Sequence, residues 1–374
     1  MSKLQELIQQ YCPDGVEYKM IGEICDLSAG GDVPKNNFSD EKNNEFSIPI
    51  ISNGIGKNAI YGYTNISKIN TTAVTISARG TIGYCELRNY PFYPVVRLIC
   101  AVPHKELLAG FLKYYLETIS FQVPKTGIPQ LTVPMVSKYV IPVPPLEVQA
   151  EIVRILDTFT ELQTKLEEEL TARQKQYEYY RDSLLNFNHK IEGVQWFELG
   201  KSCEMKAGKA ILASELNETM DSNHKFKCYG GNGIRGYIDK YNYQGEYPII
   251  GRQGALCGNV QYANGTFYAT EHAVVVKSKG FYNQRFLYYL LTYMDLNRYK
   301  SSGAQPGLAV SKLETISAPV PPLDVQQRIV EVLDNFEKIC TDLKIGLPAE
   351  INARKQQYEY YRDKLLTFRK KDEL

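Results

Sequence analysis

Glycine spacing near the middle of the chain offers the most recognisable chemical motif. Residues 231–236 have the G-x-G-x-x-G spacing whose glycines let a strand, turn and helix wrap the pyrophosphate of a dinucleotide. The surrounding sequence indicates neither a buried strand before these glycines nor a helix after them. Asn232-Gly233 is typical of a hairpin turn, and Asn53-Gly54 stands at the matching place earlier in the chain. We therefore interpret both segments as turns.

A second glycine-containing segment raises the question of methyl transfer. Residues 28–31 (Ser-Ala-Gly-Gly) are weakly similar to the cofactor loop of an adenine methyltransferase. Such an enzyme also needs an Asn/Asp-Pro-Pro-aromatic segment that holds the flipped base. The proline pairs at 144–145 and 321–322 are each preceded by valine and followed by leucine. We predict that the chain has no catalytic residues and does not methylate by itself.

Histidine, cysteine and acidic residues lack the spacing of a catalytic or metal site. The densest acidic run, Glu167–Glu169, is expected on the solvated face of a helix. We expect no bound metal, and buried, reduced thiols in a cytoplasmic chain without a membrane-spanning or signal segment. The histidines are His104, His189, His224 and His272, and the cysteines are Cys12, Cys25, Cys85, Cys100, Cys203, Cys228, Cys257 and Cys340.

Charge is distributed unevenly along the chain. The net charge of +1 over 374 residues argues against nucleic-acid binding through a bulk positive field alone. Residues 16–141 carry +2, residues 142–193 carry −4, residues 194–318 carry +4, and residues 319–374 are neutral. Two mildly basic blocks therefore alternate with acidic or neutral ones.

An internal repeat is the strongest feature of the sequence. Residues 142–159 (PVPPLEVQAEIVRILDTF) match residues 319–336 (PVPPLDVQQRIVEVLDNF) at an offset of 177. Residues 172–187 match residues 353–368 at an offset of 181, so the second copy has four extra residues between the matched blocks. The preceding segments are similar more weakly. We predict two tandem copies of a unit of about 180 residues.

The segment before each repeated block predicts a mixed domain. Short runs rich in β-branched and aromatic residues alternate with glycine and asparagine turns, which favours mostly antiparallel sheet. One helix is expected in each segment, over residues 105–119 and 284–296, because both contain a similar apolar tract (FLKYYL and FLYYLL). The predicted fold class is α+β.

Each repeated block predicts a long amphipathic helix. Apolar residues recur at spacings of three, four or seven from Ile152 to Leu184, and the same pattern runs from Ile329 to Leu365. A helix over residues 147–186 would be about 60 Å long. Gly346 and Pro348 predict a kink or short break in the second helix. We predict that the two helices pair antiparallel, with one domain at each end, in a pseudo-twofold arrangement.

The duplicated elements PVPPLEVQ-x-x-IV-x-ILD-x-F and QYEYYRD-x-LL-x-F, each behind a variable domain, resemble the specificity subunit of Type I restriction-modification systems. The resemblance covers nearly the whole chain. The helices carry the specific match, and the domains agree in general layout. The resemblance implies target-recognition domains at residues 1–141 and 193–318, a central long helix at 142–192 and a C-terminal long helix at 319–374.

The family also implies a function without enzymatic activity. Each recognition domain is expected to read one half of a split site in double-stranded DNA, and the helices are expected to set the length of the unspecified spacer. The implied partners are two adenine methyltransferase subunits, which a restriction and translocase subunit can join. S-adenosylmethionine, ATP and Mg²⁺ are expected on those partner subunits, and no cofactor is expected on this chain.

Candidate DNA contacts are polar residues on the glycine-punctuated loops. Arginine can bind guanine through two hydrogen bonds and asparagine or glutamine can bind adenine, whereas lysine mainly meets phosphate. Arg79 and Arg252 are favoured because SARGTIG and GRQGAL occupy similar places in the two copies. An ordinary turn or surface role is the alternative for each candidate. The candidates are Asn53, Lys57, Arg79, Lys125 and Gln130 in the first domain, and Asn232, Arg235, Arg252, Gln253 and Gln305 in the second.

Partner contacts are predicted on tyrosines of the repeated helices, with packing between the two helices as the alternative. These residues are Tyr177, Tyr179, Tyr180, Tyr358, Tyr360 and Tyr361. Two other functions are left open: a methyltransferase with unrecognised motifs, and a non-catalytic scaffold that spaces two sugar- or protein-binding domains. Methylation by the isolated chain would favour the first, and absence of salt-dependent DNA affinity would favour the second.

Overall fold

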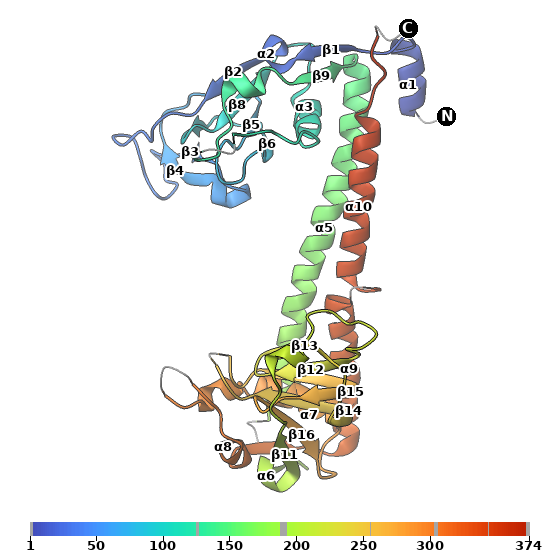
Figure 1. Ribbon diagram of the computed structural model, residues 1–374. Coiled ribbons are helices and arrows are strands. Elements are labelled where there is room, and N and C mark those ends of the chain that lie inside the picture. The colour runs from blue at the N-terminus through green and yellow to red at the C-terminus, as the bar shows by residue number, and fades with distance from the viewer. Residues whose placement is uncertain are drawn as a thin grey trace. The chain divides into compact units, whose positions relative to one another are not determined.

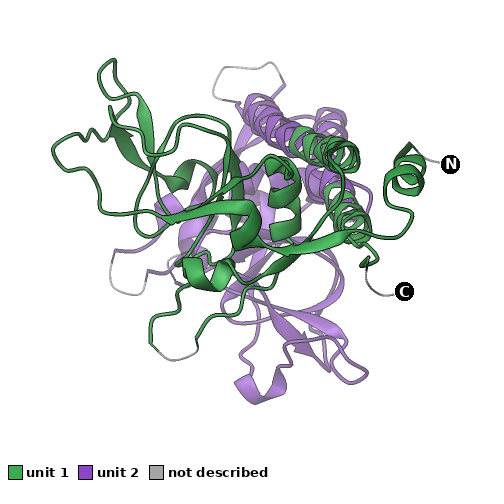
Figure 2. Cartoon of the chain, turned by 90° about the horizontal axis from the view of Figure 1, so that it is seen from above, with its two compact units in different colours: residues 1–166, 351–374 green, residues 167–350 purple. Residues whose placement is uncertain are grey.

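The chain forms two compact units, each built around a mixed domain (Figure 2). Unit 1 comprises residues 1–166 and 351–374, and unit 2 comprises residues 167–350. Both units combine helices with sheets, which confirms the predicted two-domain α+β fold. The computed structural model describes residues 3–124, 127–187, 193–254, 256–302, 306–342 and 344–371.

Unit 1 contains three small sheets. Their described strands pair antiparallel, except β3 with β7, which are parallel. In sheet order, the strands are β1 (Glu17–Met20) and β9 (Val140–Val143); β2 (Cys25–Ala29), β8 (Ile99–Pro103), β5 (Ala73–Ile76) and β6 (Cys85–Arg88); and β4 (Ile60–Thr64), β3 (Ile48–Ile51) and β7 (Tyr93–Pro94).

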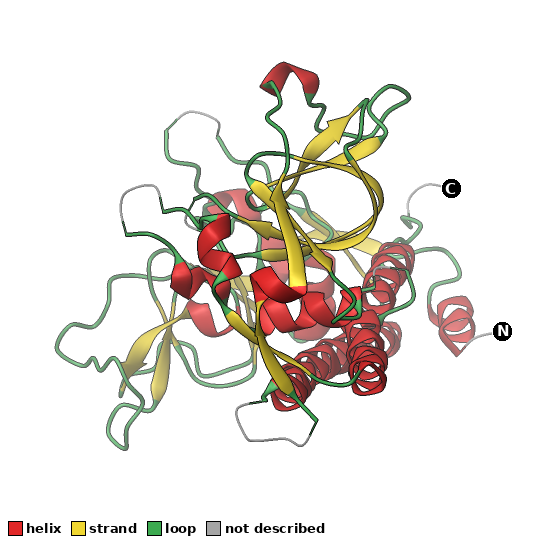
Figure 3. Ribbon diagram, turned by 90° about the horizontal axis from the view of Figure 1, so that it is seen from below, coloured by secondary structure: helices red, strands yellow, loops and turns green. Residues whose placement is uncertain are grey.

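Unit 2 contains one large sheet and one strand pair, coloured yellow with the other strands in Figure 3. Here the parallel pair is β12 with β15. In sheet order, the strands are β11 (Cys203–Ala207), β16 (Ala273–Ser278), β14 (Tyr243–Gly251), β15 (Val260–Ala269), β12 (Phe226–Gly230) and β13 (Gly233–Ile238); the pair is β10 (Gln195–Glu198) with β17 (Ser317–Val320).

The sheets of the two units have corresponding connections. The order β2-β8-β5-β6 in unit 1 matches β11-β16-β14-β15 in unit 2. Each unit also has a hairpin, β3-β4 in a separate sheet of unit 1 and β12-β13 at the end of the large sheet of unit 2. The loop between β5 and β6 is therefore the counterpart of the loop between β14 and β15. These two loops carry Arg79 and Arg252, the favoured candidates.

The helix inside each domain is shorter than predicted. The helix expected over residues 105–119 is α3 (Ala109–Leu116), and the one expected over 284–296 is α7 (Gln284–Tyr293). The short helical segments are α1 (Lys3–Tyr11), α2 (Ile21–Ile24), η1 (Gly56–Ala59), α4 (Val133–Val136), α6 (Leu199–Ser202), η2 (Ala213–Glu215), η3 (Leu296–Tyr299) and α8 (Val310–Glu314).

A buried glutamine in each repeated motif ties the start of the domain helix to the long helix. Gln149 accepts a hydrogen bond from the Leu108 N–H, and its amide donates to the carbonyls of Glu106 and Pro144. The Leu108 N–H is thus bound just before α3 begins. Gln326 makes the same three contacts with Asn283, Phe281 and Pro321. Both glutamines are fully buried and join a long helix to its domain.

The repeated blocks form the long helices in Figure 1. The first block is one continuous helix, α5 (Leu146–Leu185). The second is α9 (Leu323–Thr341) followed by α10 (Leu347–Leu365), which confirms the break predicted at Gly346 and Pro348. A side chain at Gly346 would collide with the Asp342 and Lys338 carbonyl oxygens, each 2.7 Å from its Cβ position.

Within each unit the helical stretches run antiparallel. In unit 1 the Phe159 and Tyr361 rings stack with centroids 5.6 Å apart, and Leu365 packs in the core that contains Ile152. In unit 2 the Tyr180 and Phe336 rings stack at 5.4 Å. Each stack joins the first half of one repeated block to the second half of the other. The spacing of apolar residues in the sequence allowed this pairing but did not specify it.

Candidate nucleic-acid interface

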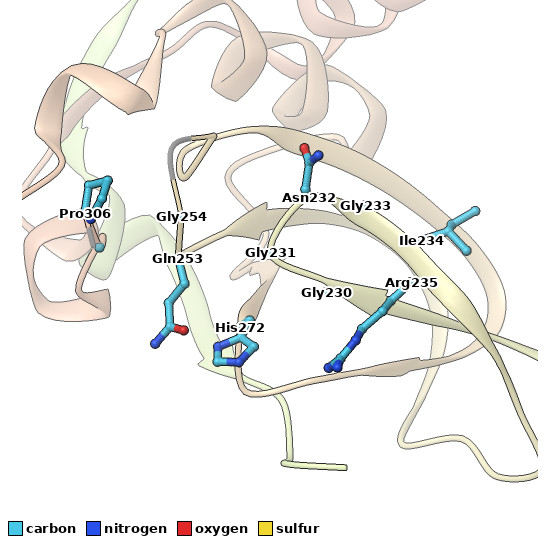
Figure 4. A pocket seen from close by; sticks show the side chains of 11 residues that line it. Gly230, Gly231, Asn232, Gly233, Ile234, Arg235, Gln253, Gly254, His272 and Pro306 are labelled. Carbon is cyan, nitrogen blue, oxygen red and sulfur yellow. The ribbon is translucent and has the colours of Figure 1, made fainter. Parts of the chain in front are cut away.

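A hollow of about 740 Å³ lies beside the β12–β13 hairpin of unit 2 (Figure 4). Its walls come from hairpin residues 230–235, residues 253–254 after β14, His272 and residues 306–307. Much of this wall is glycine, so backbone groups border the space. Three predicted DNA contacts line it: Asn232, Arg235 and Gln253.

A second hollow of about 510 Å³ adjoins the first through Gln253. Arg252, Lys300 and Lys312 line it, and its described lining residues include no carboxylate. This charge suits a phosphate group. The sequence did not indicate Lys300 and Lys312, because they lie in segments that only the fold brings beside Arg252.

Buried polar atoms without partners adjoin these hollows. Within the described part of the chain, Arg252 Nε, Glu271 Oε2 and His272 Nδ1 have no hydrogen-bond partner. The second nitrogen of His272, Nε2, lies 3.0 Å from Glu271 Oε1. Buried polar groups are normally hydrogen-bonded, so a water molecule or a change of side-chain position would be needed to complete the bonding of these atoms.

Three predicted contacts come together in unit 1. Arg79 Nε and Nη2 donate to Gln130 Oε1 over 3.0 and 2.6 Å. Asn53 Oδ1 accepts from the Ala78 N–H at 2.7 Å, and Asn53 Nδ2 donates to the Val96 carbonyl at 2.7 Å. Asn53 thus holds the loop that carries Arg79, and its side chain is already engaged with backbone.

Backbone hydrogen bonds define the register between the two loops. Leu131 N donates to the Ala78 carbonyl, and Leu308 N donates to the Arg252 carbonyl, both at 2.9 Å. Ala78 is therefore the counterpart of Arg252.

The two segments therefore occupy equivalent loops, as the sequence comparison indicated, and Arg79 corresponds to Gln253 within them. Gly80 and Gly254 follow, with φ of 67° and 87°. Side chains rarely adopt this left-handed region, so glycine at this place in both loops supports this register. A backbone hydrogen bond closes each loop, from Gly83 N to the Ser77 carbonyl in unit 1 and from Gly258 N to the Gly251 carbonyl in unit 2. The loop of unit 2 is therefore one residue longer.

The other predicted contacts occupy varied settings. Lys57 is exposed on η1, and Arg235 is exposed on β13. Asn232 is also exposed, and its Oδ1 accepts from Asn259 Nδ2 at 3.2 Å. Lys125 and Gln305, together with His189, lie outside the described residues.

The G-x-G-x-x-G segment forms the predicted hairpin. Gly230 pairs with Gly233, so residues 231–232 make the two-residue turn, one residue earlier than Asn232-Gly233. The expectation that no buried strand precedes it was wrong, because the last three residues of β12 are buried. A strand and not a helix follows, so the dinucleotide-binding arrangement is not formed.

The helix tyrosines fall into three pairs. Tyr177 and Tyr358 pack against the unit cores, and burial raises the pKa of Tyr177 to about 12. The Tyr358 hydroxyl donates to Glu117 Oε2 at 2.9 Å. Tyr180 and Tyr361 form the interhelical stacks. Tyr179 and Tyr360 are 69% and 62% exposed, so they are the most accessible of the six tyrosines to a partner.

The cysteines and the potential metal ligands are the remaining candidate groups. The eight cysteines are buried, and burial raises the pKa of Cys25 to about 12. Among the described residues, no group of three or more His, Cys, Asp or Glu side chains is placed to hold a metal ion. None of the described helices has both the length and the apolar character that a membrane span requires.

Comparison with known proteins agrees with this duplicated architecture. The family model described as "Type I restriction modification DNA specificity domain" matches residues 13–174 and 191–353. The Type I restriction enzyme EcoprrI specificity subunit of Escherichia coli is 38% identical over 292 residues, covering 72% of each chain. The crystal structure of the Type-I restriction-modification system S subunit from M. genitalium has a similar fold, with a TM-score of 0.65 and 18% identity, over 94% of this chain and 96% of that one.

These matches account for both units of the fold. The chain is a tandem protein with two DNA specificity domains. It belongs to the family of Type I restriction-modification specificity subunits.

Proposed function

We propose that this chain is the non-catalytic subunit that reads DNA for a Type I restriction-modification complex. Each recognition domain reads one half of a bipartite site in double-stranded DNA. The observation that carries this proposal is the occurrence of polar side chains, Arg79 and Gln253, at equivalent places in the two domains. The hollow lined by Arg252, Lys300 and Lys312 supports it further, because phosphate contacts position a protein on DNA while base contacts provide sequence specificity.

The long helices would set the spacer between the half-sites. We assign residues 1–141 and 193–318 to the recognition domains, residues 142–192 to the central helix and residues 319–374 to the C-terminal helix. The continuity of α5 over 40 residues supports a rigid connection, which fixes both separation and helical phase along the duplex. The two interhelical stacks have matching positions in the repeat, which supports a pseudo-twofold arrangement.

Two methyltransferase subunits would bind the helical blocks, and a restriction and translocase subunit would join some complexes. The exposed Tyr179 and Tyr360 support this, because aromatic residues often anchor protein interfaces. S-adenosylmethionine, ATP and Mg²⁺ would be bound by those partners, which supply methyl transfer and DNA translocation.

The test is a genome-wide map of N6-methyladenine in cells with and without the gene, with the partner subunits present. Loss of one bipartite motif on deletion is the expected result, and re-expression of the chain should restore the same motif. An unchanged methylation map would contradict the proposal.

A further inference from the structure

The loop register pairs two residues with different base preferences. Arg79 directly follows Ala78, whose carbonyl accepts a hydrogen bond from the Leu131 N–H. Gln253 directly follows Arg252, whose carbonyl accepts one from the Leu308 N–H. Each precedes a glycine with positive φ. Their backbone settings are therefore alike, and the side chains are the main chemical difference between the two positions.

The contacts of Arg79 leave one edge of its guanidinium group available. Nε and Nη2 both donate to Gln130 Oε1, so the Nε edge is bound to the protein. The other edge, formed by Nη1 and the second hydrogen of Nη2, has no hydrogen-bond partner among the described residues. Two parallel donors of this kind match the O6 and N7 acceptors of guanine in the major groove. Gln130 restrains the side chain and so lowers the entropy cost of that contact.

Gln253 combines an exposed position with a neighbouring cationic surface. Its side chain has no recorded hydrogen bond in the described part of the chain, and it borders both hollows of unit 2. The amide of glutamine offers one donor and one acceptor, which match N7 and N6 of adenine. Arg252, directly before it, borders the hollow whose three cations suit a phosphate.

We propose that Arg79 and Gln253 are equivalent base-reading residues, with Arg79 contacting a guanine in one half-site and Gln253 an adenine in the other. Gln130 is a positioning residue that orients Arg79. This inference rests on the proposed function and adds to it a base type for one position in each half-site.

The test measures methylation by the chain assembled with its methyltransferase subunits, on duplexes that carry every base pair at each half-site position. Arg79→Ala should remove the preference at a single G·C position of one half-site, by about 5- to 150-fold. Arg79→Lys, which keeps the charge, should weaken it, because lysine lacks the planar fork that fixes two parallel donors. Gln253→Ala should act on a single A·T position of the other half-site.

Base analogues separate base reading from phosphate binding. Replacing the chosen guanine by 7-deazaguanine should weaken methylation by the wild-type complex and have little further effect with Arg79→Ala. Gln130→Ala should reduce the same preference, and Gln130→Glu should restore it because a side-chain oxygen again accepts from Arg79. A purely structural role of Gln130 would lower activity on all sequences alike.

Several outcomes would overturn the inference while leaving the proposed function intact. They are unchanged specificity in both alanine variants, an even loss across all sequences, or full specificity retained by Arg79→Lys. Thermal unfolding of each variant shows whether it is folded. If a variant is misfolded, the effect of 7-deazaguanine on methylation by the wild-type complex tests the guanine contact instead. Absence of sequence-dependent methylation by the wild-type complex would instead reject the proposed function itself.

Discussion

The Tyr114 hydroxyl donates a 2.6 Å hydrogen bond to Asp157 Oδ1, which ties α3 to the long helix that follows it. The second unit repeats this contact between Tyr289 and Asp334, and there the same hydroxyl also lies 2.8 Å from Glu337 Oε2. These contacts connect each recognition domain to its helix through residues repeated in both copies.

Removing these hydroxyls should destabilise the two units unequally. Tyr114→Phe should lower the free energy of unfolding by about 1 kcal/mol, because the exposed Asp157 carboxylate can bind water instead. Tyr289→Phe should cost about 2 kcal/mol, because its hydroxyl both donates its hydrogen to the carboxylate pair and accepts a hydrogen bond from Arg285 Nη2. Urea unfolding of both variants measures the difference, and equal effects would contradict it.

Replacing the buried Gln326 should lower the free energy of unfolding more than replacing its exposed neighbour Gln327. Gln326→Leu leaves the Asn283 N–H and the carbonyls of Phe281 and Pro321 without a side-chain partner. We expect a loss of about 3 kcal/mol or more. Gln327→Leu is the matched control and should change stability by less than about 1 kcal/mol. Chemical denaturation of the two variants checks the prediction, which a similar loss in both would reject.

Acid should weaken the attachment of α1 through Glu151. Hydrogen bonds from Arg154 and Lys3 lower the pKa of this carboxyl to about 2, from an ordinary value of 4.5. A depressed folded-state pKa stabilises the protein above pH 4.5, and this contribution is lost as the pH falls from about 4.5 to about 2. Melting temperatures across that range should fall less steeply for Glu151→Gln than for the wild type; parallel curves would argue against the contact.

The length of α5 should determine the spacer between half-sites. Deleting four residues between Leu162 and Leu170 shortens the helix by about 6 Å, close to two base pairs, while rotating the apolar seam only slightly. The expected methylation motif has a shorter spacer and unchanged half-sites. Inserting four residues is the complementary variant and should lengthen the spacer. Unchanged spacing in the methylation maps of both variants would show that α5 is not the ruler.

Substitution of an exposed tyrosine should affect partner binding, whereas substitution of a stacked tyrosine should affect the stability of the fold. Tyr179→Ala should weaken binding of the methyltransferase subunit and leave the unfolding free energy within about 0.5 kcal/mol of wild type. Tyr180→Ala removes the stack with Phe336 and should lower stability by about 1 kcal/mol or more. Affinity titrations alongside urea unfolding distinguish the two, and undiminished partner affinity of Tyr179→Ala would reject its assigned role.

The duplicated organisation could be predicted from the sequence because it depends on local patterns. Period-3.6 apolar spacing determines a helix along its own length, and the proline and glycine near residue 346 interrupt it through backbone sterics. The offsets of 177 and 181 likewise identify the repeat without any knowledge of contacts. The repetition of Gln149 as Gln326 was visible too, although their buried role was not.

Only the tertiary structure decided which loop residues correspond and which tyrosines remain exposed. The pairing of Arg79 with Gln253 follows from backbone hydrogen bonds to Leu131 and Leu308, some 50 residues further along the chain. The segments SARGTIG and GRQGAL indicated similar places, but the one-residue difference in loop length left the pairing of individual residues open. Tyr179 and Tyr180 are adjacent and chemically identical, and only the packing of α9 buries one ring face and leaves the other side chain in solvent.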